Sequence, residues 1–430
     1  MEEREHDLLI IGGGLTGAVA ARRARQLGLS TLLAAATPGS LPYTSGALDL
    51  LAVYPTETKH YRRSPWEALA ELTDNEPAHP YARVGLGAVQ RAWEDFAAYL
   101  EAGALRYHRR REENLLLVTA AGTLKPTQLV PRSMRGNVLA WESKEPTLLC
   151  GFERLVDFTP EHVAQSLSER WPGLTTTRID ATTLLGDERR VRAVELAAAF
   201  ERPGFRERFA ERVRRELGPA RHLGLPAVLG FGGVVEAVEH LERLLGVSVF
   251  EIPMLSPSLP GMRLADLLRA DLVDAGVELL QGRPVARLEC AGDRVAGALW
   301  SGRDLERRLR ARSVILATGR FFGGGLVAGR DRVTEPLLGL DLAAPVSRDA
   351  WHMRSFLGAP GHPINRVGLA TDDGLRPVDS GGKPVFSNLC AAGAILAGHD
   401  WVREKSGAGI SVVTAHAAAE RIAAELGGGA

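Results

Sequence analysis

The apolar positions near the N-terminus form a strand, a helix and a second strand in succession. Residues 7–11 contain the apolar run Leu8–Ile11, which is typical of a buried strand. Residues 15–27 carry apolar side chains at helical spacing, and Gly28 suits the exit of that helix. A second strand begins at Thr31–Leu33. This βαβ pattern has the spacing of a dinucleotide-binding fold.

The pattern changes between residues 75 and 250. Charge-dense helical stretches dominate there, and residues 206–212 place opposite charges at the spacing of helical neighbours. Residues 226–230 are apolar and predict a short buried strand. We therefore predict an α/β fold with two domains. A Rossmann-like domain is formed by 1–74 and 251–430, and 75–250 is an inserted α/β domain with its own core.

After residue 250 the sequence predicts a helix over 264–274 and a strand over 277–280. Three short strand-like runs follow, with hairpin-turn sequences between them. The runs are 285–288, 295–300 and 305–309, and the turns are Gly292–Asp293 and Ser301–Gly302. The last run leads into 314–316, so we expect a β-meander inserted in the Rossmann-like sheet.

Three glycine-rich segments each follow a strand-like run. They are Gly12–Gly17, Ala317–Gly319, and Gly393 with Gly407 and Gly409 at the start of the last helical pattern. Such glycines allow a tight turn and close approach of a phosphate, and a helix N-terminus directs its amides at an anion. Together the three segments predict one extended, phosphate-bearing ligand, and their order predicts a flavin. The structural alternatives are a plain βα turn for the first segment, a strand-end turn for the second and an ordinary glycine-bounded helix for the third.

We predict that these segments and the hydroxylated loop at 43–47 contact the cofactor. The predicted contacts are Gly12, Gly14, Leu15, Thr16, Gly17, Thr44, Ser45, Gly46, Ala317, Thr318, Gly319, Gly393, Gly407 and Gly409. The N-terminus of the last helix would lie near the pyrimidine edge of the flavin, where positive charge stabilises the reduced, anionic form.

The stretch Leu33–Thr37 lacks the carboxylate that usually holds the adenosine ribose of a dinucleotide. FMN has no adenosine ribose and would lose no contact through the missing carboxylate, so we rank FMN above FAD. FAD stays open because backbone groups or Thr37 could substitute. A nicotinamide dehydrogenase ranks last because it leaves the second and third glycine segments unexplained.

Charge and composition narrow the function further. Lysine plus arginine equals aspartate plus glutamate, 52 each, which gives no indication of nucleic-acid binding. The three cysteines show no C-x-x-C spacing, so we expect no iron–sulfur cluster and no metal site. The start lacks a signal-peptide pattern and no apolar run approaches ~18 residues. We expect a cytoplasmic protein that is peripheral to the inner membrane only through a partner subunit.

Four residues are candidates for substrate chemistry. Arg263, Arg320 and Arg376 lie beside the motif segments and suit a phosphorylated or carboxylated small molecule. His399, next to Gly398, could take a hydroxyl proton during hydride removal. A solvated surface arginine and a backbone-bonded histidine are the structural alternatives.

Several longer stretches resemble one known family. They are Ser45–Leu51, His79–Tyr81, Phe321–Ala328, Glu335–Asp341 and Thr371–Pro377. In these stretches the chain resembles the B subunit of anaerobic glycerol-3-phosphate dehydrogenase. The similarity runs from the N-terminus to the last helix and is weak between about 100 and 220. The glycine motifs alone would match many flavoproteins of the fumarate-reductase and succinate-dehydrogenase type.

The resemblance implies a flavoprotein with FMN that pairs with an FAD-bearing A subunit. The pair is expected to oxidise sn-glycerol 3-phosphate to dihydroxyacetone phosphate. Electrons would pass through a membrane-attached iron–sulfur C subunit to menaquinone. Related fumarate reductases bond flavin covalently to a histidine after the second strand. Here that loop is Tyr43-Thr44-Ser45, so we expect a non-covalent flavin.

The primary hypothesis is therefore a flavin-dependent subunit of a glycerol-3-phosphate:quinone oxidoreductase. The second hypothesis is a non-catalytic electron-relay or assembly subunit that holds flavin but no substrate. A flavin-dependent reductase of an unsaturated substrate is the third, because the architecture is shared.

Overall fold

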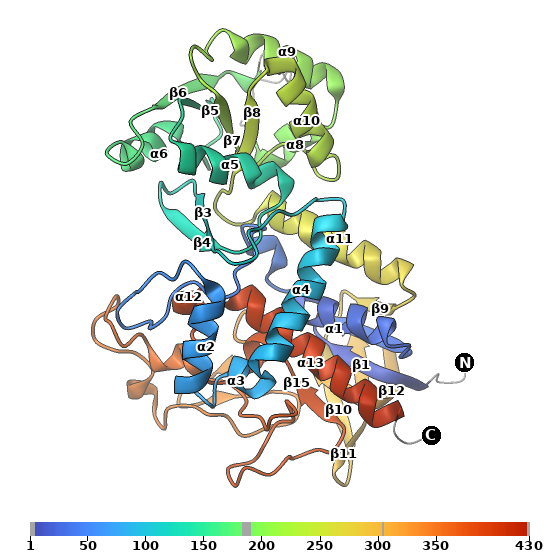
Figure 1. Ribbon diagram of the computed structural model, residues 1–430. Helices are drawn as coiled ribbons and strands as arrows, with labels where there is room; N and C mark the ends of the chain where they lie inside the picture. Colours follow the sequence, from blue (N-terminus) through green and yellow to red (C-terminus); the bar gives the residue numbers. More distant parts are fainter. Residues whose placement is uncertain (1–4, 183–190, 303–304, 428–430) are drawn as a thin grey trace. The chain divides into compact units, whose positions relative to one another are not determined.

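The computed structural model describes residues 5–182, 191–302 and 305–427, and they divide into two compact units (Figure 1). The first unit is formed by Met1–Leu41, Asp49–Phe96 and Ala265–Ala430, and the second by Pro42–Leu48 and Ala97–Leu264. The boundaries predicted at residues 75 and 250 differ from this grouping. Two continuous helices, α4 (Leu86–Ala102) and α11 (Leu259–Asp274), run from one unit into the other.

The first unit is built on a mixed seven-stranded sheet. Its order is β10-β11-β12-β1-β2-β9, and β15 also pairs with β12. The strands are β1 (Glu5–Ile11), β2 (Thr31–Ala35), β9 (Glu278–Gln281), β10 (Val285–Ala291), β11 (Arg294–Gly302), β12 (Leu305–Leu316) and β15 (Leu389–Ala391). Strands β10, β11 and β12 are antiparallel neighbours, whereas β1, β2, β9 and β15 join the sheet in parallel. The predicted βαβ unit and β-meander are both present.

The register of this sheet brings the three glycine segments to one edge. Ile11 pairs with Leu316, and Leu316 pairs with Ala391. These residues end three adjacent parallel strands, so the segments that follow them leave the sheet side by side. In open α/β sheets, ligands bind at this carboxyl edge of the strands.

Helices α1 (Leu15–Gln26) and α13 (Gly407–Gly427) pack against each other in the first unit (Figure 1). Small side chains allow this, since the buried positions of α1 are mainly alanines. The remaining helices of this unit are α2 (Pro65–Asn75), α3 (Pro80–Val84) and α12 (Trp401–Glu404). Short 3₁₀ turns and the hairpin of β13 (Val327–Ala328) and β14 (Val333–Thr334) interrupt the long segment between β12 and β15.

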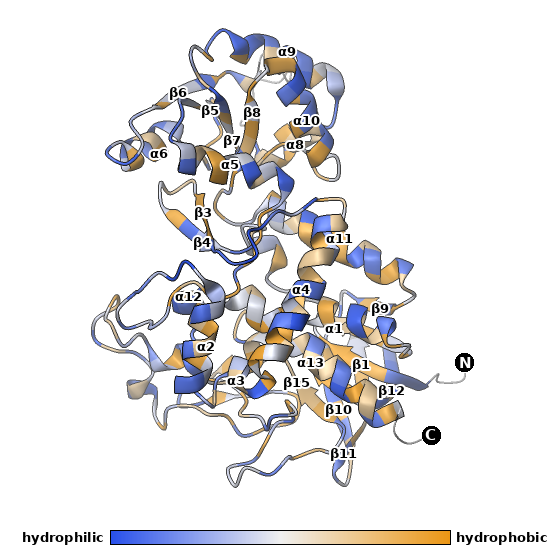
Figure 2. Ribbon diagram, in the orientation of Figure 1, coloured by the Kyte–Doolittle hydropathy of each residue, from blue (hydrophilic) through white to orange (hydrophobic). Residues whose placement is uncertain are grey.

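The second unit contains a four-stranded parallel sheet in the order β6-β5-β7-β8. Its strands are β5 (Thr147–Phe152), β6 (Leu174–Ile179), β7 (His222–Pro226) and β8 (Ser248–Ile252), and a separate hairpin joins β3 (Leu115–Val118) to β4 (Leu124–Thr127). Its helices are α5 (Arg132–Ser143), α6 (Pro160–Leu167), α8 (Ala193–Phe200), α9 (Pro203–Arg214) and α10 (Val234–Leu245). Strand β8 is largely orange in Figure 2, and β5 and β7 are buried along their whole length, as expected for the centre of a sheet covered by helices.

The strand predicted at 226–230 is wrong, because β7 ends at Pro226 and residues 227–230 form a buried loop. The apolar side chains are buried as expected, but the backbone is satisfied outside the sheet. Ala227 donates its N–H to the carbonyl of Ile252, and Leu229 donates to the Glu251 carboxylate at 2.7 Å. An apolar run therefore predicted burial correctly and secondary structure incorrectly.

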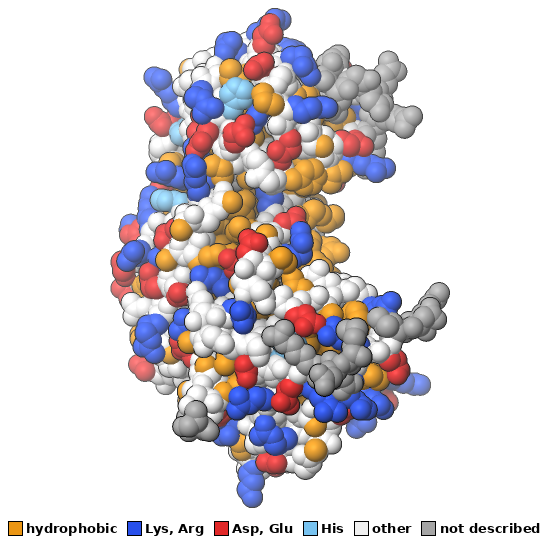
Figure 3. All heavy atoms as spheres, turned by 90° about the vertical axis from the view of Figure 1, so that its right-hand side faces the viewer, with side chains coloured by type: hydrophobic (Ala, Val, Ile, Leu, Met, Phe, Trp, Pro, Cys, Tyr) orange, Lys and Arg blue, Asp and Glu red, His pale blue; other side chains and the backbone are white. Residues whose placement is uncertain are grey.

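Charged side chains of both signs are interspersed on the face shown in Figure 3. This agrees with the equal numbers of basic and acidic residues, 52 each. In the part of the chain that the structure describes, no helix is both long and apolar enough to cross a bilayer.

Candidate functional site

The turn between β1 and α1 is packed so closely that two of its positions require glycine. Gly12 has φ +125°, and a Cβ there would lie 2.2 Å from the Ala317 carbonyl oxygen. A Cβ on Gly17 would lie 1.8 Å from the Gly12 oxygen. These contacts bring the first glycine segment directly against the second.

The N-terminus of α1 is open to an anion. Its N-cap is Gly14, no side chain caps it, and the first turn carries no acidic residue. The nearest heavy atom to a Cβ on Gly14 would be the Gly39 Cα, at 3.9 Å. No side chain of the protein therefore caps the first backbone amides and the positive end of the helix dipole, an arrangement that suits a phosphate group.

The third glycine segment meets the first at Gly393. This residue has φ +78°, and a Cβ there would lie 2.1 Å from Thr16 Oγ1. Its N–H donates to Thr414 Oγ1 of α13 at 2.8 Å. Thr16 and Gly393, both predicted cofactor contacts, are thus neighbours.

The second segment holds a polar atom that the protein leaves unsatisfied. Thr318 Oγ1 is buried and has no hydrogen-bond partner among the described residues. Gly319, at φ +71°, turns the chain, and a Cβ on Gly325 would lie 2.0 Å from the Gly319 oxygen. Together with the open N-terminus of α1, the free hydroxyl of Thr318 fits a bound polar cofactor.

Two predicted cofactor glycines have other structural uses. Helix α13 begins at Gly407, where a Cβ would lie 3.2 Å from the Trp401 ring. Gly409 donates its N–H to the Asp49 carbonyl at 2.8 Å, and a Cβ there would lie 2.1 Å from the Tyr81 hydroxyl. Close packing explains both positions, and their cofactor contacts stay a prediction.

The predicted contacts Thr44, Ser45 and Gly46 belong to the second unit. Thr44 Oγ1 accepts the Gly46 N–H at 3.4 Å, and Ser45 Oγ accepts the Ala47 N–H at 3.3 Å. Tyr107 donates its hydroxyl to the Gly46 carbonyl at 2.6 Å. These bonds stabilise a local turn, and the assignment of this loop to the cofactor stays a prediction.

The loop after β2 lies against the first glycine turn and carries no carboxylate. A Cβ on Gly13 would lie 2.6 Å from the Thr37 carbonyl oxygen, and Thr37 Oγ1 accepts the Gly39 N–H at 3.2 Å. A polar but uncharged residue therefore occupies the place where dinucleotide folds usually present an acid.

Arg320 and His399, two predicted catalytic residues, are in contact. Arg320 Nη2 donates to His399 Nδ1 at 3.2 Å and to the backbone oxygens of Leu396 and His399 at 2.9 and 3.0 Å. Its Nη1 donates to the Asn365 carbonyl. Burial lowers the pKa of Arg320 to about 10, opposed by the charges of Glu404 and Asp400, so the guanidinium remains charged at neutral pH. Arg320 ties the second glycine segment to the chain that follows the third.

His399 is fully buried. Burial, reinforced by the positive charge of Arg320, holds the pKa of His399 well below its usual value. The ring is therefore neutral near pH 7. Both ring nitrogens face the guanidinium, because Arg320 Nη2 lies 3.2 Å from Nδ1 and 3.4 Å from Nε2. This geometry does not favour His399 as a proton acceptor.

A buried carboxylate, Glu404, lies at the centre of this polar cluster. It accepts hydrogen bonds from Ser406 Oγ at 2.7 Å, from the Asp400 N–H at 2.6 Å and from His79 Nε2 at 3.4 Å. His79 Nδ1 accepts the Tyr81 N–H, so its proton lies on the Nε2 that faces Glu404. Burial alone would raise the pKa of Glu404, but hydrogen bonds from His79 and Ser406 favour the carboxylate, and the pKa is lowered to about 2.

The other two predicted catalytic arginines are held in ion pairs. Arg263 is buried in the second unit, donates to Glu251 at 2.6 and 3.0 Å and donates its Nε–H to the Gly230 carbonyl at 2.8 Å. Arg376 donates to Asp372 at 2.8 Å through Nε and at 2.7 Å through Nη2. These carboxylates are within the chain itself, so neither arginine is the solvated surface residue of the structural alternative, and their contact with substrate stays a prediction.

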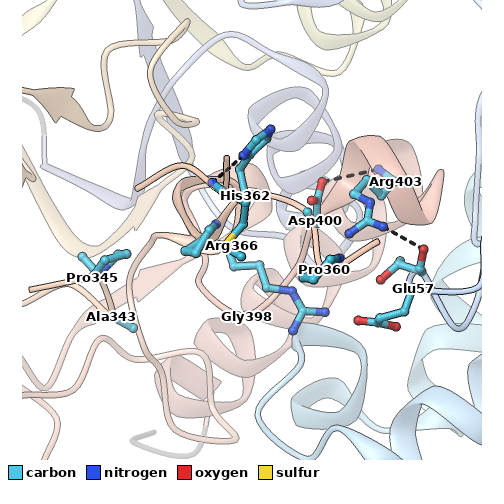
Figure 4. A pocket seen from close by; sticks show the side chains of 14 residues that line it. Glu57, Ala343, Pro345, Pro360, His362, Arg366, Gly398, Asp400 and Arg403 are labelled. Atoms are coloured by element: carbon cyan, nitrogen blue, oxygen red, sulfur yellow. Dashed lines mark hydrogen bonds between the residues drawn. The ribbon is translucent and has the colours of Figure 1, made fainter. Parts of the chain in front are cut away.

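A pocket of about 410 Å³ lies in the first unit, and its lining includes Gly398 and Asp400, the two sequence neighbours of His399 (Figure 4). Its charged lining residues are Glu57, Arg366, Asp400 and Arg403, together with His362. Gly398 also lines it, and the Gly398 N–H donates to the Arg366 carbonyl at 3.0 Å. The pocket is therefore formed beside the residues that follow the third glycine segment.

Sequence reasoning missed Arg366, Asp400 and Arg403. Asp400 and Arg403 follow His399 directly, and charged residues in a mainly apolar segment could have drawn attention to them. Arg366 has no such local sign, since its place in the pocket depends on long-range folding. Among the described residues, no group of three or more histidine, cysteine, aspartate or glutamate side chains could hold a metal ion.

Comparison with known proteins identifies the class and then the family. The sequence matches the FAD binding domain family over residues 7–410, which defines a flavin-binding protein of mixed α/β fold. The probable anaerobic glycerol-3-phosphate dehydrogenase B subunit of Halobacterium salinarum is 34% identical, over 96% of this chain and 97% of that protein. The corresponding B subunit of Yersinia pseudotuberculosis is 32% identical, over 98% of each. The solved 3-ketosteroid delta1-dehydrogenase from Sterolibacterium denitrificans covers 98% of this chain and 100% of its own, with 15% identity and a TM-score of 0.45.

The chain belongs to the family of anaerobic glycerol-3-phosphate dehydrogenase B subunits. The predicted fold class and the resemblance are confirmed. The prediction of a flavoprotein subunit of a dehydrogenase is confirmed at that level.

Proposed function

We propose that this chain binds a flavin non-covalently and oxidises sn-glycerol 3-phosphate to dihydroxyacetone phosphate. Electrons then pass to a quinone, menaquinone, which makes the complex a glycerol-3-phosphate:quinone oxidoreductase. The observation that carries this proposal is the pocket in which Arg366 and Arg403 lie beside Asp400. Relatives named as B subunits of this dehydrogenase support the choice of substrate.

The glycine segments would hold the cofactor. The open N-terminus of α1 at Gly14 suits the flavin phosphate, and Thr318 Oγ1 supplies a free polar contact. A flavin supplies the hydride acceptor that alcohol oxidation needs. We propose FMN rather than FAD, because the loop after β2 offers Thr37 where a ribose-binding carboxylate would stand.

The pocket suits a small phosphate ester. Its volume, about 410 Å³, lies in the range of small-molecule sites. Arg366 also pairs with Glu76 at 3.2 Å, and Arg403 Nη2 donates to the Thr56 carbonyl at 2.9 Å, so both side chains are held in place. Held guanidinium groups bind phosphate with little loss of side-chain entropy.

We propose that the chain works in a complex with an FAD-bearing A subunit and an iron–sulfur C subunit. The C subunit would attach the complex to the inner membrane and pass electrons to menaquinone. This chain itself would be cytoplasmic. The names of the relatives, which describe them as subunits, support a multi-subunit assembly.

A second candidate is an electron-relay or assembly subunit that holds flavin but no substrate. It is favoured by one observation: Arg263 and Arg376, two predicted phosphate ligands, are already paired with carboxylates. Anaerobic addition of glycerol 3-phosphate to the flavin-loaded chain separates the two functions. Bleaching of the flavin absorbance and measurable heat of binding support the dehydrogenase. No bleaching and no heat, with flavin bound, support the relay.

A further inference from the structure

We propose that Asp400 accepts the hydroxyl proton of the alcohol substrate, in place of His399. The proposal rests on the proposed function, since it assigns a group in the same pocket. Oxidation of a secondary alcohol removes a proton from oxygen and a hydride from carbon, so a basic group must face the hydroxyl.

The geometry of His399 does not suit this task. The side chain is fully buried, and it does not belong to the lining of the pocket. Both of its ring nitrogens face Arg320 Nη2, at 3.2 and 3.4 Å. Taking a proton on either nitrogen would place a second positive charge beside a buried guanidinium.

Asp400 is only 4% exposed, but unlike His399 it is one of the residues that line the pocket. It lines the pocket and lies beside Arg403 in Figure 4. Its Oδ2 accepts from Asn365 Nδ2 at 3.2 Å, and its Oδ1 accepts from the Arg403 N–H at 3.4 Å. A carboxylate offers about four acceptor positions, so each oxygen keeps one for the substrate.

The backbone fixes the position of this carboxylate. The Asp400 N–H donates to Glu404 Oε1 at 2.6 Å, and Glu404 is itself buried and bonded to Ser406. Asp400 also caps the short helix α12. The buried Glu404 is thereby a positioning residue for Asp400, and it repels any shift of the Asp400 carboxylate toward the interior.

The pocket also places opposite charges where the substrate needs them. Arg366 and Arg403 would bind the phosphate, and Asp400 would face the hydroxyl of the same molecule. In the reaction, the O–H bond breaks and its proton passes to the Asp400 carboxylate. A bound flavin would be the oxidant that accepts the hydride of the C2–H bond, and the C=O bond would form as that bond breaks. The alcohol loses two electrons, and the proton and hydride are both accounted for.

The experiment compares Asp400→Asn with the unaltered chain, both loaded with flavin. Two readouts are needed: the rate of anaerobic flavin reduction by glycerol 3-phosphate, and the Kd of glycerol 3-phosphate by calorimetry. Asparagine preserves the helix cap, so the fold should be retained. We expect reduction to slow by about 10²- to 10⁴-fold, the usual range for a general base. The Kd should stay the same or fall, because a negative charge beside the phosphate site is removed.

Two matched variants sharpen the result. Asp373→Asn removes the same charge from an exposed position outside the pocket, and His399→Gln removes the alternative base; each should slow reduction less than tenfold. In Asp400→Ser, added formate should restore reduction at least tenfold by supplying a carboxylate in the vacated space. The rescue keeps the proposal testable if Asp400→Asn is poorly folded.

The outcomes distinguish a failure of the role of Asp400 from a failure of the proposed function. Reduction by Asp400→Asn within tenfold of the unaltered chain overturns the role of Asp400, and so does a failure of formate to rescue an Asp400→Ser variant that binds phosphate. A flavin-loaded, unaltered chain that glycerol 3-phosphate never reduces overturns the proposed function, and the role of Asp400 falls with it.

Discussion

Each unit has a glycine-rich turn between a buried parallel strand and a helix, but the two helix N-termini are used differently. In the first unit, α1 begins at Gly14 with no capping side chain and no acid in its first turn. In the second unit, α10 follows Gly230–Gly233, and the Glu201 carboxylate accepts the N–H groups of Phe231 and Gly233 at 2.5 and 3.2 Å. The protein thus supplies its own anion at α10. A glycine turn is a phosphate site only where no such anion fills it.

The ion pairs show the same contrast. Arg263 in the second unit is fully engaged by Glu251 and by the Gly230 carbonyl. In the first unit, Arg366 pairs with Glu76 and Arg403 donates to the Thr56 carbonyl. Both arginines also line the pocket. Charged groups that the fold satisfies completely are structural, whereas partly satisfied groups beside a cavity are available to a ligand.

The largest expected effect on the free energy of unfolding comes from breaking the Arg263–Glu251 ion pair. Glu251→Gln leaves the Arg263 charge buried without its counter-ion, and such changes cost about 3–5 kcal/mol. Urea unfolding should show this loss, while folded protein keeps its flavin. An unfolding free energy within 1 kcal/mol of the original, taken as about the error of the method, would show that Arg263 is not a structural residue.

Acid should weaken the first unit through Glu404. Its pKa is lowered from the usual 4.5 to about 2, so its contribution is present above pH 4.5 and is lost as the pH falls toward 2. The full contribution is on the order of 3 kcal/mol. Stability measured from pH 7 down to 3 should fall more steeply for the unaltered chain than for Glu404→Gln. Parallel curves would contradict the assignment of a buried, ionised Glu404.

A carboxylate placed at the uncapped N-terminus of α1 should occupy its amides, as Glu201 does at α10. Gly14 has φ −78° and room for a side chain, so Gly14→Asp should fold and should cap α1. Its carboxylate takes the amides that a phosphate would use and repels that phosphate. We expect flavin affinity to fall about 100-fold, measured by fluorescence titration, with the melting temperature unchanged or raised.

The control for that change is Gly14→Asn, which caps the helix without adding charge. Its flavin affinity should be about tenfold higher than that of Gly14→Asp. Equal affinities in the two variants would show that bulk, and not charge, excludes the ligand.

The smallest effect is expected at the filled N-terminus of α10. Glu201→Gln removes the charge that faces the Phe231 and Gly233 amides and should cost about 1–2 kcal/mol in urea unfolding. Flavin content should not change. Loss of flavin from this variant would mean that the N-terminus of α10 also contributes to cofactor binding.

The sequence predicted the elements that depend on local patterns. The βαβ unit, the β-meander and the start of the last helix at Gly407 all follow from apolar periodicity and glycine positions. The close approach of the first and third segments, at Thr16 and Gly393, agrees with the predicted convergence on one sheet edge.

Long-range contacts explain what the sequence could not predict. The pocket joins Thr56, Arg366 and Arg403 from three separated segments, and no local pattern relates them. Likewise, the sequence could not show that Glu251 neutralises Arg263. The failed strand at 226–230 has the same origin, because a side-chain carboxylate replaces the backbone partner that a strand would use.

The most direct test of the account is the identity and amount of flavin released from the purified chain by mild denaturation. Mass spectrometry and absorbance should give one FMN per chain, released without covalent attachment. FAD in its place would correct the nucleotide and leave the site intact. A colourless chain that takes up neither FMN nor FAD on incubation would contradict the claim that the ends of β1, β12 and β15 form a flavin site.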